Sequence, residues 1–562
     1  MSRTSPYENQ GTSLSVAERR NLGLTGLMPA AVDTLDIQKR RVLQHLRSRK
    51  TMLDKYVAMA HLRTTNIRLF YKVVMDELEE FAPIIYTPTV GTACLEYSNL
   101  YPLAGPGVPD GLYLTDTDFA TLCNTIKNYQ STPDFEPEVA VISDGSRILG
   151  LGDLGVDGMP IPIGKLQLYV AGAGIDPRRT LPILLDLGTN NEKLRTSEFY
   201  LGLRQPRPND EQFYAIVDKV LKALRTVYPN MFIQFEDWSS EHAFELLSRY
   251  QNKMLCFNDD IQGTGAVILA GVINAIRRVE QESGILPSDH RVVFYGAGSA
   301  GIGVARQIQD YFQYQLGMSE QEAQKLFWIV DSKGLVTLDR GDKLAQHKVY
   351  YARKDNQGKQ YKKLMDIIDY IRPTMLIGLS SIPGAFTKDV LRRMAELNKQ
   401  PIVFPLSNPA TKAECTFEDA MQATENRVIF ASGTAFPPYT IPGTNDVRIP
   451  AQGNNMYIFP GLGLGAVAAK PAHISNAMVY ATAKALAESL TPEERKRGWL
   501  YPSLQRIRSV SANVAAALCL EAKKEGLVRA EAILNATSYD QLVQLVEKRM
   551  WWPQAKLENS KI

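Results

Sequence analysis

Two acidic sequences lie directly after short apolar segments in the middle of the chain. Residues 231–235 run into Glu236 and Asp237, and residues 254–257 lead to Asp260. Taken singly, each acidic sequence could cap a helix or form a solvated turn, since Asp and Asn do both routinely. Two in matching positions favour a cation site, because carboxylates gathered at neighbouring strand ends repel one another unless a cation neutralises them. Oxygen ligands without a nearby histidine or thiolate favour Mg²⁺ or Mn²⁺.

A glycine-rich sequence follows the apolar residues 292–295. It consists of Gly296, Ala297, Gly298, Ser299, Ala300 and Gly301. A GxGxxG pattern between a strand and a helix is typical of dinucleotide binding. The first glycine makes a tight turn, the second lets a pyrophosphate approach the backbone, and the third lets the helix pack on the strand. A glycine turn without a ligand is the alternative, which the strand–helix alternation after it disfavours.

Asp331 ends the next apolar segment and bears on the choice of dinucleotide. It lies thirty residues after Gly301, and the glutamine-rich residues 307–324 account for the excess over the usual ~20. An acid at this strand end normally binds the ribose 2′-hydroxyl of NAD, whereas a nearby base accommodates the 2′-phosphate of NADP. Lys333 follows closely and Lys348 could add a second positive charge, so this pattern leaves both cofactors open.

Three further residues are of types that could act on a bound substrate. Lys165 follows the glycine- and proline-rich residues 158–164 and is expected to open a helix. The helix dipole disfavours a positive charge at that end, so we expect its pKa to be lowered toward that of a useful base. An ordinary surface lysine is the alternative. Tyr86 could simply be a packed aromatic residue, and Arg147 could be an anion clamp or an exposed arginine.

The elements that must position these residues alternate along the chain. Apolar residues at helical spacing predict helices over residues 15–80, 210–228, 241–250, 300–314, 475–491, 503–524 and 529–536. Short apolar runs predict buried strands at residues 139–143, 181–187, 231–235, 254–257, 292–295, 326–330, 374–379, 402–406 and 428–431. Strands that alternate with helices predict an α/β fold with parallel sheets and helices on both faces.

The composition is that of an ordinary globular protein. The 562 residues are 45% hydrophobic and 22% charged, and 63 basic against 60 acidic side chains leave a net charge of +3. Without a long basic run, binding to nucleic acid or to a membrane surface has little electrostatic support. The apolar stretches are shorter than the ~20 residues that span a bilayer, and the polar first residues do not resemble a signal peptide. Five scattered cysteines form no CxxC pair, so we expect a soluble protein of a reducing compartment.

Taken together, these motifs resemble those of the malic enzyme family, in the family's order over nearly the whole chain. The matching segments are YTPTVG (86–91), DGSRILGLGDLG (144–155), PIGK (162–165), DLGTNN (186–191), QFEDW (234–238), FNDDIQGT (257–264), GAGSAG (296–301), PLSNP (405–409) and NNMYIFPG (454–461). The resemblance implies a Rossmann-like NAD(P)-binding domain and a second α/β substrate domain, with helical N- and C-terminal regions. The implied division is 1–110 for the helical region with Tyr86, 111–260 for substrate and metal, 261–453 for NAD(P), 454–530 for a return to the substrate domain and 531–562 for a C-terminal tail.

The resemblance also implies roles for individual residues. Tyr86 would donate a proton to the enol carbon, and Lys165 would be the general base on the malate hydroxyl. The metal ligands would be Glu236, Asp237 and Asp260, with Asp259 beside them. Substrate contacts would come from Arg147, Asn408 and Asn455. The cofactor would contact Arg147, Gly296, Gly298, Ser299, Ala300, Gly301, Asp331 and Asn408.

The implied activity is oxidative decarboxylation of L-malate to pyruvate and CO₂, with NADP or NAD and with Mg²⁺ or Mn²⁺. The DSKG sequence at 331–334 resembles NADP-preferring members and favours NADP. A malolactic enzyme, which converts malate to lactate with bound NAD, is the nearest alternative, because GLGLGAVAAK (461–470) resembles that branch. A non-catalytic nucleotide-binding regulator on the same fold is a second alternative. The resemblance further implies a homotetramer.

The sequence favours a cytoplasmic location. The final residues Ser560, Lys561 and Ile562 differ by one conservative change from the peroxisomal signal Ser-Lys-Leu. A peroxisome-type organelle is therefore the alternative location.

Overall fold

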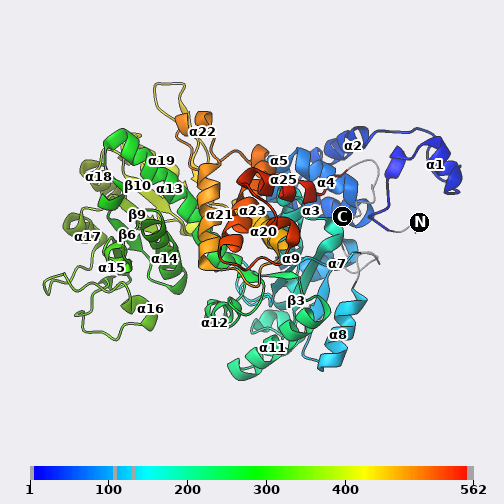
Figure 1. The fold of residues 1–562 in the computed structure, drawn as a ribbon, viewed down its shortest axis with the longest axis horizontal. Coiled ribbons are helices and arrows are strands. Elements are labelled where there is room, and N and C mark those ends of the chain that lie inside the picture. The colour runs from blue at the N-terminus through cyan, green and yellow to red at the C-terminus, as the bar shows by residue number, and fades with distance from the viewer. Residues whose placement is uncertain (1–4, 105–109, 130–134, 554–562) are drawn as a thin grey trace. The chain divides into compact units, whose positions relative to one another are not determined.

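The computed structural model describes residues 5–104, 110–129 and 135–553. The predicted alternative targeting signal at 560–562 therefore lies outside the described residues. Within those ranges, every helix is too short or too polar to cross a lipid bilayer. The chain forms two compact units, each made of segments that are distant in the sequence (Figure 1). The first contains Met1–Asn258, Pro460–Ile474 and Leu504–Ile562, and the second contains Asp259–Phe459 and Ser475–Ser503.

Short helices form the beginning of the first unit, as the apolar spacing predicts. They are α1 (Val16–Asn21), α2 (Leu35–Arg47), α3 (Met52–Thr65), α4 (Ile67–Asp76), α5 (Leu78–Ile85), α6 (Thr89–Leu95) and α7 (Tyr97–Ala104). Thr34, Thr51 and Asn66 each accept a hydrogen bond from the first turn of the following helix, as N-cap residues do. Because α5 ends at Ile85, Tyr86 follows it directly, in a buried position.

A five-stranded parallel sheet forms the centre of the first unit. Its strands are β1 (Leu112–Leu114), β2 (Val139–Ser143), β3 (Thr180–Leu185), β4 (Phe232–Phe235) and β5 (Cys256–Asn258), in the order β1-β3-β2-β4-β5. Four of them confirm predicted strands, whereas β1, which has only three residues, was not predicted. Because all five strands are parallel, the residues that follow β2, β4 and β5 lie at the same edge of the sheet.

The other helices of the first unit pack around this sheet and on one another. They are α8 (Phe119–Asn128), α9 (Pro160–Ala173), α10 (Glu192–Thr196), α11 (Asp210–Val227), α12 (Ser240–Tyr250), α20 (Phe459–Ala469), α23 (Ile507–Lys524), α24 (Glu531–Leu534) and α25 (Tyr539–Arg549). The most central is α9, which is buried along its whole length and packs on β2, β3 and α23.

The start of α9 corrects one prediction. The helix begins at Pro160, so Lys165 lies in its second turn, and the prediction that Lys165 opens the helix is wrong. The glycine- and proline-rich sequence suggested a loop, but proline fits the first turn of a helix, where the backbone N–H groups need no partner within the helix. The helix-dipole argument that rests on a terminal position therefore does not apply to Lys165.

The C-terminal residues of the first unit also differ from the prediction of a tail at 531–562. In the described part, α24 and α25 follow α23, and α25 packs along α23 with Leu542 and Val546 buried. The backbone N–H of Trp551 donates to the carbonyl of Gly174, the C-cap residue of α9, at 2.7 Å. This segment is therefore attached to the central helix of the unit.

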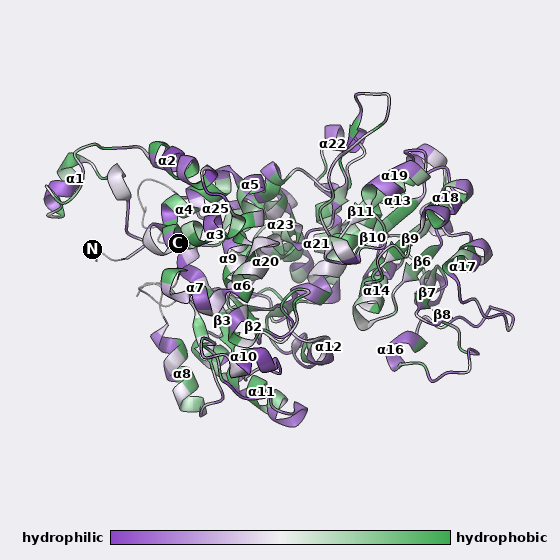
Figure 2. Ribbon diagram, turned by 180° about the vertical axis from the view of Figure 1, so that it is seen from behind, coloured by the Kyte–Doolittle hydropathy of each residue, from purple (hydrophilic) through white to green (hydrophobic). Residues whose placement is uncertain are grey.

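The second unit contains a seven-stranded sheet. Its strands are β6 (Val292–Tyr295), β7 (Phe327–Asp331), β8 (Gly334–Leu335), β9 (Met375–Gly378), β10 (Ile402–Pro405), β11 (Ile429–Ser432) and β14 (Ala451–Gln452), in the order β14-β11-β10-β9-β6-β7-β8. All neighbours are parallel except β7 and β8. Figure 2 shows β9 and β10 in green, and all of their residues are buried. Apart from the short antiparallel β8, this is the strand order of a Rossmann sheet, which confirms the predicted α/β fold.

The helices of the second unit pack on this sheet and on one another. They are α13 (Thr264–Ser283), α14 (Ser299–Tyr314), α17 (Leu364–Ile371), α18 (Lys388–Leu397), α19 (Phe417–Ala423) and α21 (Asn476–Glu488). Smaller elements are α15 (Glu320–Gln324), α16 (Gln346–Val349), α22 (Pro492–Lys496), and the pair β12 (Tyr439–Thr440) and β13 (Val447–Arg448). Because α21 buries its apolar residues against α13, residues 475–503 belong to this unit. The sequence predicts that all of 454–530 returns to the substrate domain. In the structure only residues 460–474 and 504–530 of this range belong to the first unit.

Candidate active site

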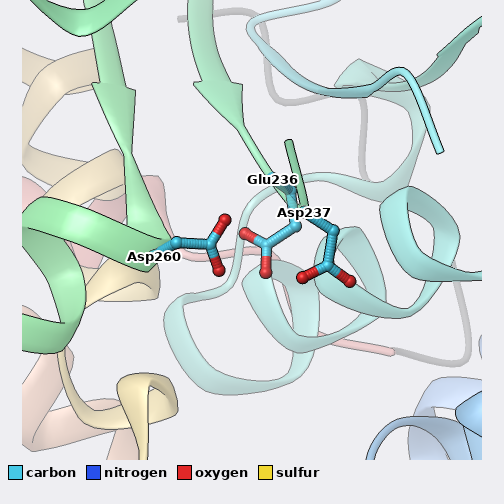
Figure 3. A group of neighbouring side chains, drawn as sticks. All are labelled: Glu236, Asp237 and Asp260. Carbon is cyan, nitrogen blue, oxygen red and sulfur yellow. The ribbon is translucent and has the colours of Figure 1, made fainter. Parts of the chain in front are cut away.

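Three carboxylates gather at the carboxyl ends of β4 and β5, where the sequence predicts a cation site (Figure 3). Glu236 and Asp237 follow β4 directly, and Asp260 is the second residue after β5. One carboxylate oxygen from each lies within 4.8 Å of the others, with Glu236 and Asp237 buried and Asp260 half-buried. Figure 3 shows the carboxylates of Glu236 and Asp260 pointing toward each other. Like charges this close favour a compensating cation, and three oxygen donors fit Mg²⁺ or Mn²⁺.

The backbone at Asp237 has a left-handed conformation, with φ 53°. Few residues other than glycine adopt it. In this conformation, the carbonyl of Asp237 accepts a hydrogen bond from the Arg147 N–H at 3.3 Å. The carboxylate of Asp237 accepts another from the Leu149 N–H at 3.1 Å. The loops that follow β2 and β4 therefore hold each other in place.

Glu236 connects both predicted acid–base residues to the three carboxylates. The Nζ of Lys165 lies 3.0 Å from Oε1 of Glu236, and the Tyr86 hydroxyl donates to the same oxygen at 3.3 Å. The other oxygen accepts from the Gln234 amide at 2.7 Å, and the Tyr169 hydroxyl donates to the oxygen of that amide. Lys165 also lies 5.1 Å from the centre of the Tyr86 ring. Two side chains with exchangeable protons thus meet at a carboxylate suited to a metal, an arrangement that can carry out acid–base chemistry.

Arg147 lies at the same edge of the sheet as Glu236, but its side chain contacts α12. It is exposed, and its guanidinium donates to the Ser240 hydroxyl at the start of α12. The loop that carries it is anchored by Arg207, which pairs with Asp153 at 2.8 Å and with Asp144 at 3.3 Å. Burial opposes the charge of Arg207, but these carboxylates outweigh it and raise its pKa. The sequence did not predict this anchor, because its partners lie more than fifty residues away.

The predicted glycine turn lies between β6 and α14, beside the point where the strand order reverses. Gly296 has φ 125°, and a Cβ there would lie 2.3 Å from the Leu379 carbonyl oxygen. A Cβ on Gly301 would lie 2.3 Å from the Gly296 carbonyl oxygen, whereas one on Gly298 would meet no described atom within 4 Å. Ser299 and Ala300 begin α14. The turn is therefore tight at its first glycine, open at its second and closely packed at its third, which fits a pyrophosphate at the helix N-terminus.

Asp331, at the end of β7, already has two cationic partners. Arg340 donates to its two carboxylate oxygens at 2.8 and 3.0 Å, and Lys348 donates to one of them at 2.8 Å. Burial opposes ionisation of Asp331, but these hydrogen bonds outweigh it and lower its pKa to about 2. Lys333 instead pairs with Asp342 at 2.9 Å. The sequence pointed to the two lysines but missed Arg340.

The two predicted asparagines of the second unit have different surroundings. Asn408 follows β10 in an exposed position, and its amide donates to the Gly433 carbonyl at 3.1 Å. Asn455 donates to the carbonyl of Asp259 at 3.2 Å and to its carboxylate at 3.1 Å. Asn408 thus lies at the carboxyl edge of the second sheet, whereas Asn455 contacts the turn that carries Asp260.

Comparison with known proteins identifies the family. The family model described as "Malic enzyme, N-terminal domain" matches residues 63–251, and that described as "Malic enzyme, NAD binding domain" matches residues 261–523. The chain therefore belongs to the malic enzyme family.

Individual relatives match over nearly the full chain. The "NADP-dependent malic enzyme" of Dictyostelium discoideum is 46% identical over 540 residues, which are 95% of this chain and 96% of the relative. The "NADP-dependent malic enzyme 3" of Arabidopsis thaliana is 41% identical over 549 residues, which are 98% of this chain and 90% of the relative. The crystal structure of the Entamoeba histolytica malic enzyme aligns with a TM-score of 0.55 at 23% identity, over 94% of this chain and 90% of that one. That of the Pyrococcus horikoshii enzyme aligns with a TM-score of 0.54 at 24% identity, over 84% and 89%. The two solved structures share the fold.

Substitution of the open glycine tests the dinucleotide turn. Gly298→Ala should leave the thermal midpoint unchanged, because its Cβ meets no protein atom, but should weaken NADP binding because the methyl group lies where a pyrophosphate approaches. A loss of about tenfold, or 1.4 kcal/mol, is expected in isothermal titration calorimetry. Gly301→Ala is the contrasting variant and should lower the thermal midpoint, since its Cβ collides with the Gly296 carbonyl. Unchanged NADP affinity in Gly298→Ala would contradict the assignment of the turn.

Proposed function

We propose that this chain is an NADP-dependent malic enzyme that converts L-malate to pyruvate and CO₂ with the help of a divalent metal ion. The observation that carries the proposal is the meeting of Lys165 and Tyr86 at Glu236, one of three clustered carboxylates. The relatives from D. discoideum and A. thaliana, both named NADP-dependent malic enzymes, support the same activity. Their names do not favour the malolactic alternative. A complete set of acid–base and metal-binding residues does not favour a non-catalytic regulator.

Lys165 and Tyr86 divide the proton transfers of this reaction. Oxidation of malate requires a base for the proton of the C2 hydroxyl, which is the role of Lys165. After CO₂ has left, C3 requires a proton to give pyruvate, which is the role of the Tyr86 hydroxyl. Since both groups lie at the same oxygen of Glu236, acceptor and donor can reach one small substrate. Arg147 and Asn408 supply further contacts to substrate or cofactor.

The carboxylates of Glu236, Asp237 and Asp260 would hold Mg²⁺ or Mn²⁺. Such an ion, when bound, acts as a Lewis acid that stabilises negative charge on a substrate oxygen. The glycine turn at 296–301 would hold the nicotinamide cofactor, which would supply the hydride acceptor. The protein's own part is to hold these groups at strand ends, so that their positions are set by the sheets rather than by flexible loops.

The preference for NADP rests on the cations around Asp331. An aspartate alone at this strand end would accept the ribose 2′-hydroxyl of NAD and repel a 2′-phosphate. Here Arg340 and Lys348 both pair with the carboxylate of Asp331. Arg340 and Lys333 both pair with Asp342, so three cations face two carboxylates and this cluster carries a net positive charge. Charge-assisted hydrogen bonds from such side chains suit a phosphate. NAD remains the weaker cofactor in this proposal.

The assembly and location of the protein are further parts of the proposal. The family resemblance supports a homotetramer. The balanced net charge supports a protein without nucleic-acid or membrane partners, and the unpaired cysteines suit the cytoplasm. A peroxisome-type organelle is the alternative location.

An assay with both cofactors tests the reaction. The purified protein, given malate, Mn²⁺ and NADP, should release free reduced nicotinamide, measured by its absorbance, and should do so less efficiently with NAD. Lactate without free reduced cofactor would identify a malolactic enzyme instead. Binding of nucleotide without turnover of malate would favour the regulator.

Two variants test the division of proton transfers. Lys165→Ala should block malate oxidation but spare decarboxylation of added oxaloacetate, because only oxidation needs a base on the C2 hydroxyl. Tyr86→Phe should slow pyruvate formation from both substrates, by about 10²–10⁴-fold for the loss of one acid–base group. Oxidation of malate is measured by nicotinamide absorbance, and pyruvate formation is measured for both substrates. If both variants lost only oxidation, the two residues would act as one coupled base and the proposed roles would be wrong.

A variant of Lys348 tests the cofactor preference. Lys348→Gln should lower kcat/KM for NADP by about 10–100-fold, because a hydrogen bond to a charged group contributes about 1.5–3 kcal/mol, and should change kcat/KM for NAD little. Lys343→Gln, an equal change of charge at an exposed position five residues earlier, is the matched control. An equal loss with both cofactors would show that Lys348 supports the local structure around Asp331 and does not bind the 2′-phosphate.

A further inference from the structure

The turn that carries Asp260 has an unusual backbone. Asp259–Gly263 forms a π-helical turn between β5 and α13. Such turns are rare, and their wider hydrogen-bond spacing makes them less regular than the α-helix that follows. The direction in which Asp260 projects therefore depends on the side chains that hold this turn.

Gln307, on α14, is one of those side chains. Its amide nitrogen donates to the backbone carbonyl of Ile261 at 3.2 Å, and Ile261 is the residue directly after Asp260. Gln307 lies two turns along α14 from the glycine turn, on a helix that packs against both the π-helical turn and α13. The contact thus joins the cofactor-binding helix to the segment that carries a metal ligand.

Two observations describe the surroundings of the Gln307 amide. A Cβ on Gly265, the second residue of α13, would lie 2.3 Å from the amide carbon of Gln307, so a side chain there would push the amide out of its place. The amide oxygen of Gln307 is buried and has no hydrogen-bond partner among the described residues. An unpartnered buried acceptor costs free energy. The amide is therefore aimed by its contact with Ile261 and not by a partner for its oxygen.

Asn455 holds the same turn at a neighbouring position. Its amide contacts Asp259 through the carbonyl and carboxylate oxygens, and also the Thr264 hydroxyl at 3.0 Å. Two amide side chains thus contact the residues immediately before and after Asp260. This arrangement fixes the backbone on both sides of a metal-binding carboxylate.

We propose that Gln307 is a positioning residue for the metal site, which holds the backbone at Ile261 so that Asp260 presents its carboxylate to the ion. The proposal rests on the proposed function, because it takes Asp260 as a metal ligand. Residues that orient metal ligands commonly contribute about 10–100-fold to metal affinity. Gln307 acts through Asp260 and does not itself contact the ion.

Metal binding by the full-length protein, without substrate, tests this role. Gln307→Met keeps the length of the side chain but removes the donor, and should weaken Mn²⁺ binding about tenfold, measured from the electron paramagnetic resonance signal of free Mn²⁺. NADP affinity and the thermal midpoint should stay unchanged. Gln309→Met is the matched control, because Gln309 is a buried glutamine on the same helix whose amide contacts Tyr350 and Tyr351 instead. It should bind Mn²⁺ as the unchanged protein does.

A second variant keeps the test independent of the folding of Gln307→Met. Gly265→Ala retains Gln307 but places a methyl group where its amide lies, and should also weaken Mn²⁺ binding. Asp260→Ala separates the two levels of the proposal. If Asp260→Ala binds Mn²⁺ normally, the metal assignment itself is wrong. If Asp260→Ala weakens binding while Gln307→Met and Gly265→Ala do not, only the positioning role is overturned.

Discussion

The buried charge of Glu236 is the constraint on which the first unit depends. A carboxylate that is only 2% exposed is costly unless it is paired and hydrogen-bonded. Its partners come from three places: Lys165 from α9, Gln234 from β4 and Tyr86 from the residue after α5. The packing of these elements must therefore bring their polar groups to one point. The same packing that satisfies this charge brings together Lys165 and Tyr86, the two residues proposed to transfer protons.

The fold could be predicted well where the sequence contains continuous apolar runs. Nine buried strands and the main helices were predicted because parallel strands covered on both faces are apolar throughout. Five strands of two or three residues were not predicted, namely β1, β8, β12, β13 and β14. The start of α9 was misplaced because proline suggests a loop in sequence but is compatible with the first turn of a helix.

The site could be predicted only where its residues form short sequence motifs. Acidic residues after strands and the GxGxxG pattern are local signals, and the structure places both at the expected strand ends. The partners of these residues are not local. Arg207 pairs with an aspartate 54 residues away, and Gln307 contacts a carbonyl 46 residues away. Such pairings cannot be predicted from a single sequence. They depend on how helices and loops pack on the sheets and not on the neighbouring residues in the sequence.

The discontinuous first unit has a consequence for the order of events during protein synthesis. Once Ser503 has been added, every residue of the second unit exists, whereas the first unit still lacks α23, α24 and α25. Since α23 packs on the buried α9, the helix that carries Lys165 cannot reach its final surroundings until residues 504–549 have been translated. Domains that emerge first from the ribosome commonly fold first. Here the segment made first is completed last. The nascent chain therefore passes through a stage in which the second unit can fold before Lys165, on α9, is fully enclosed.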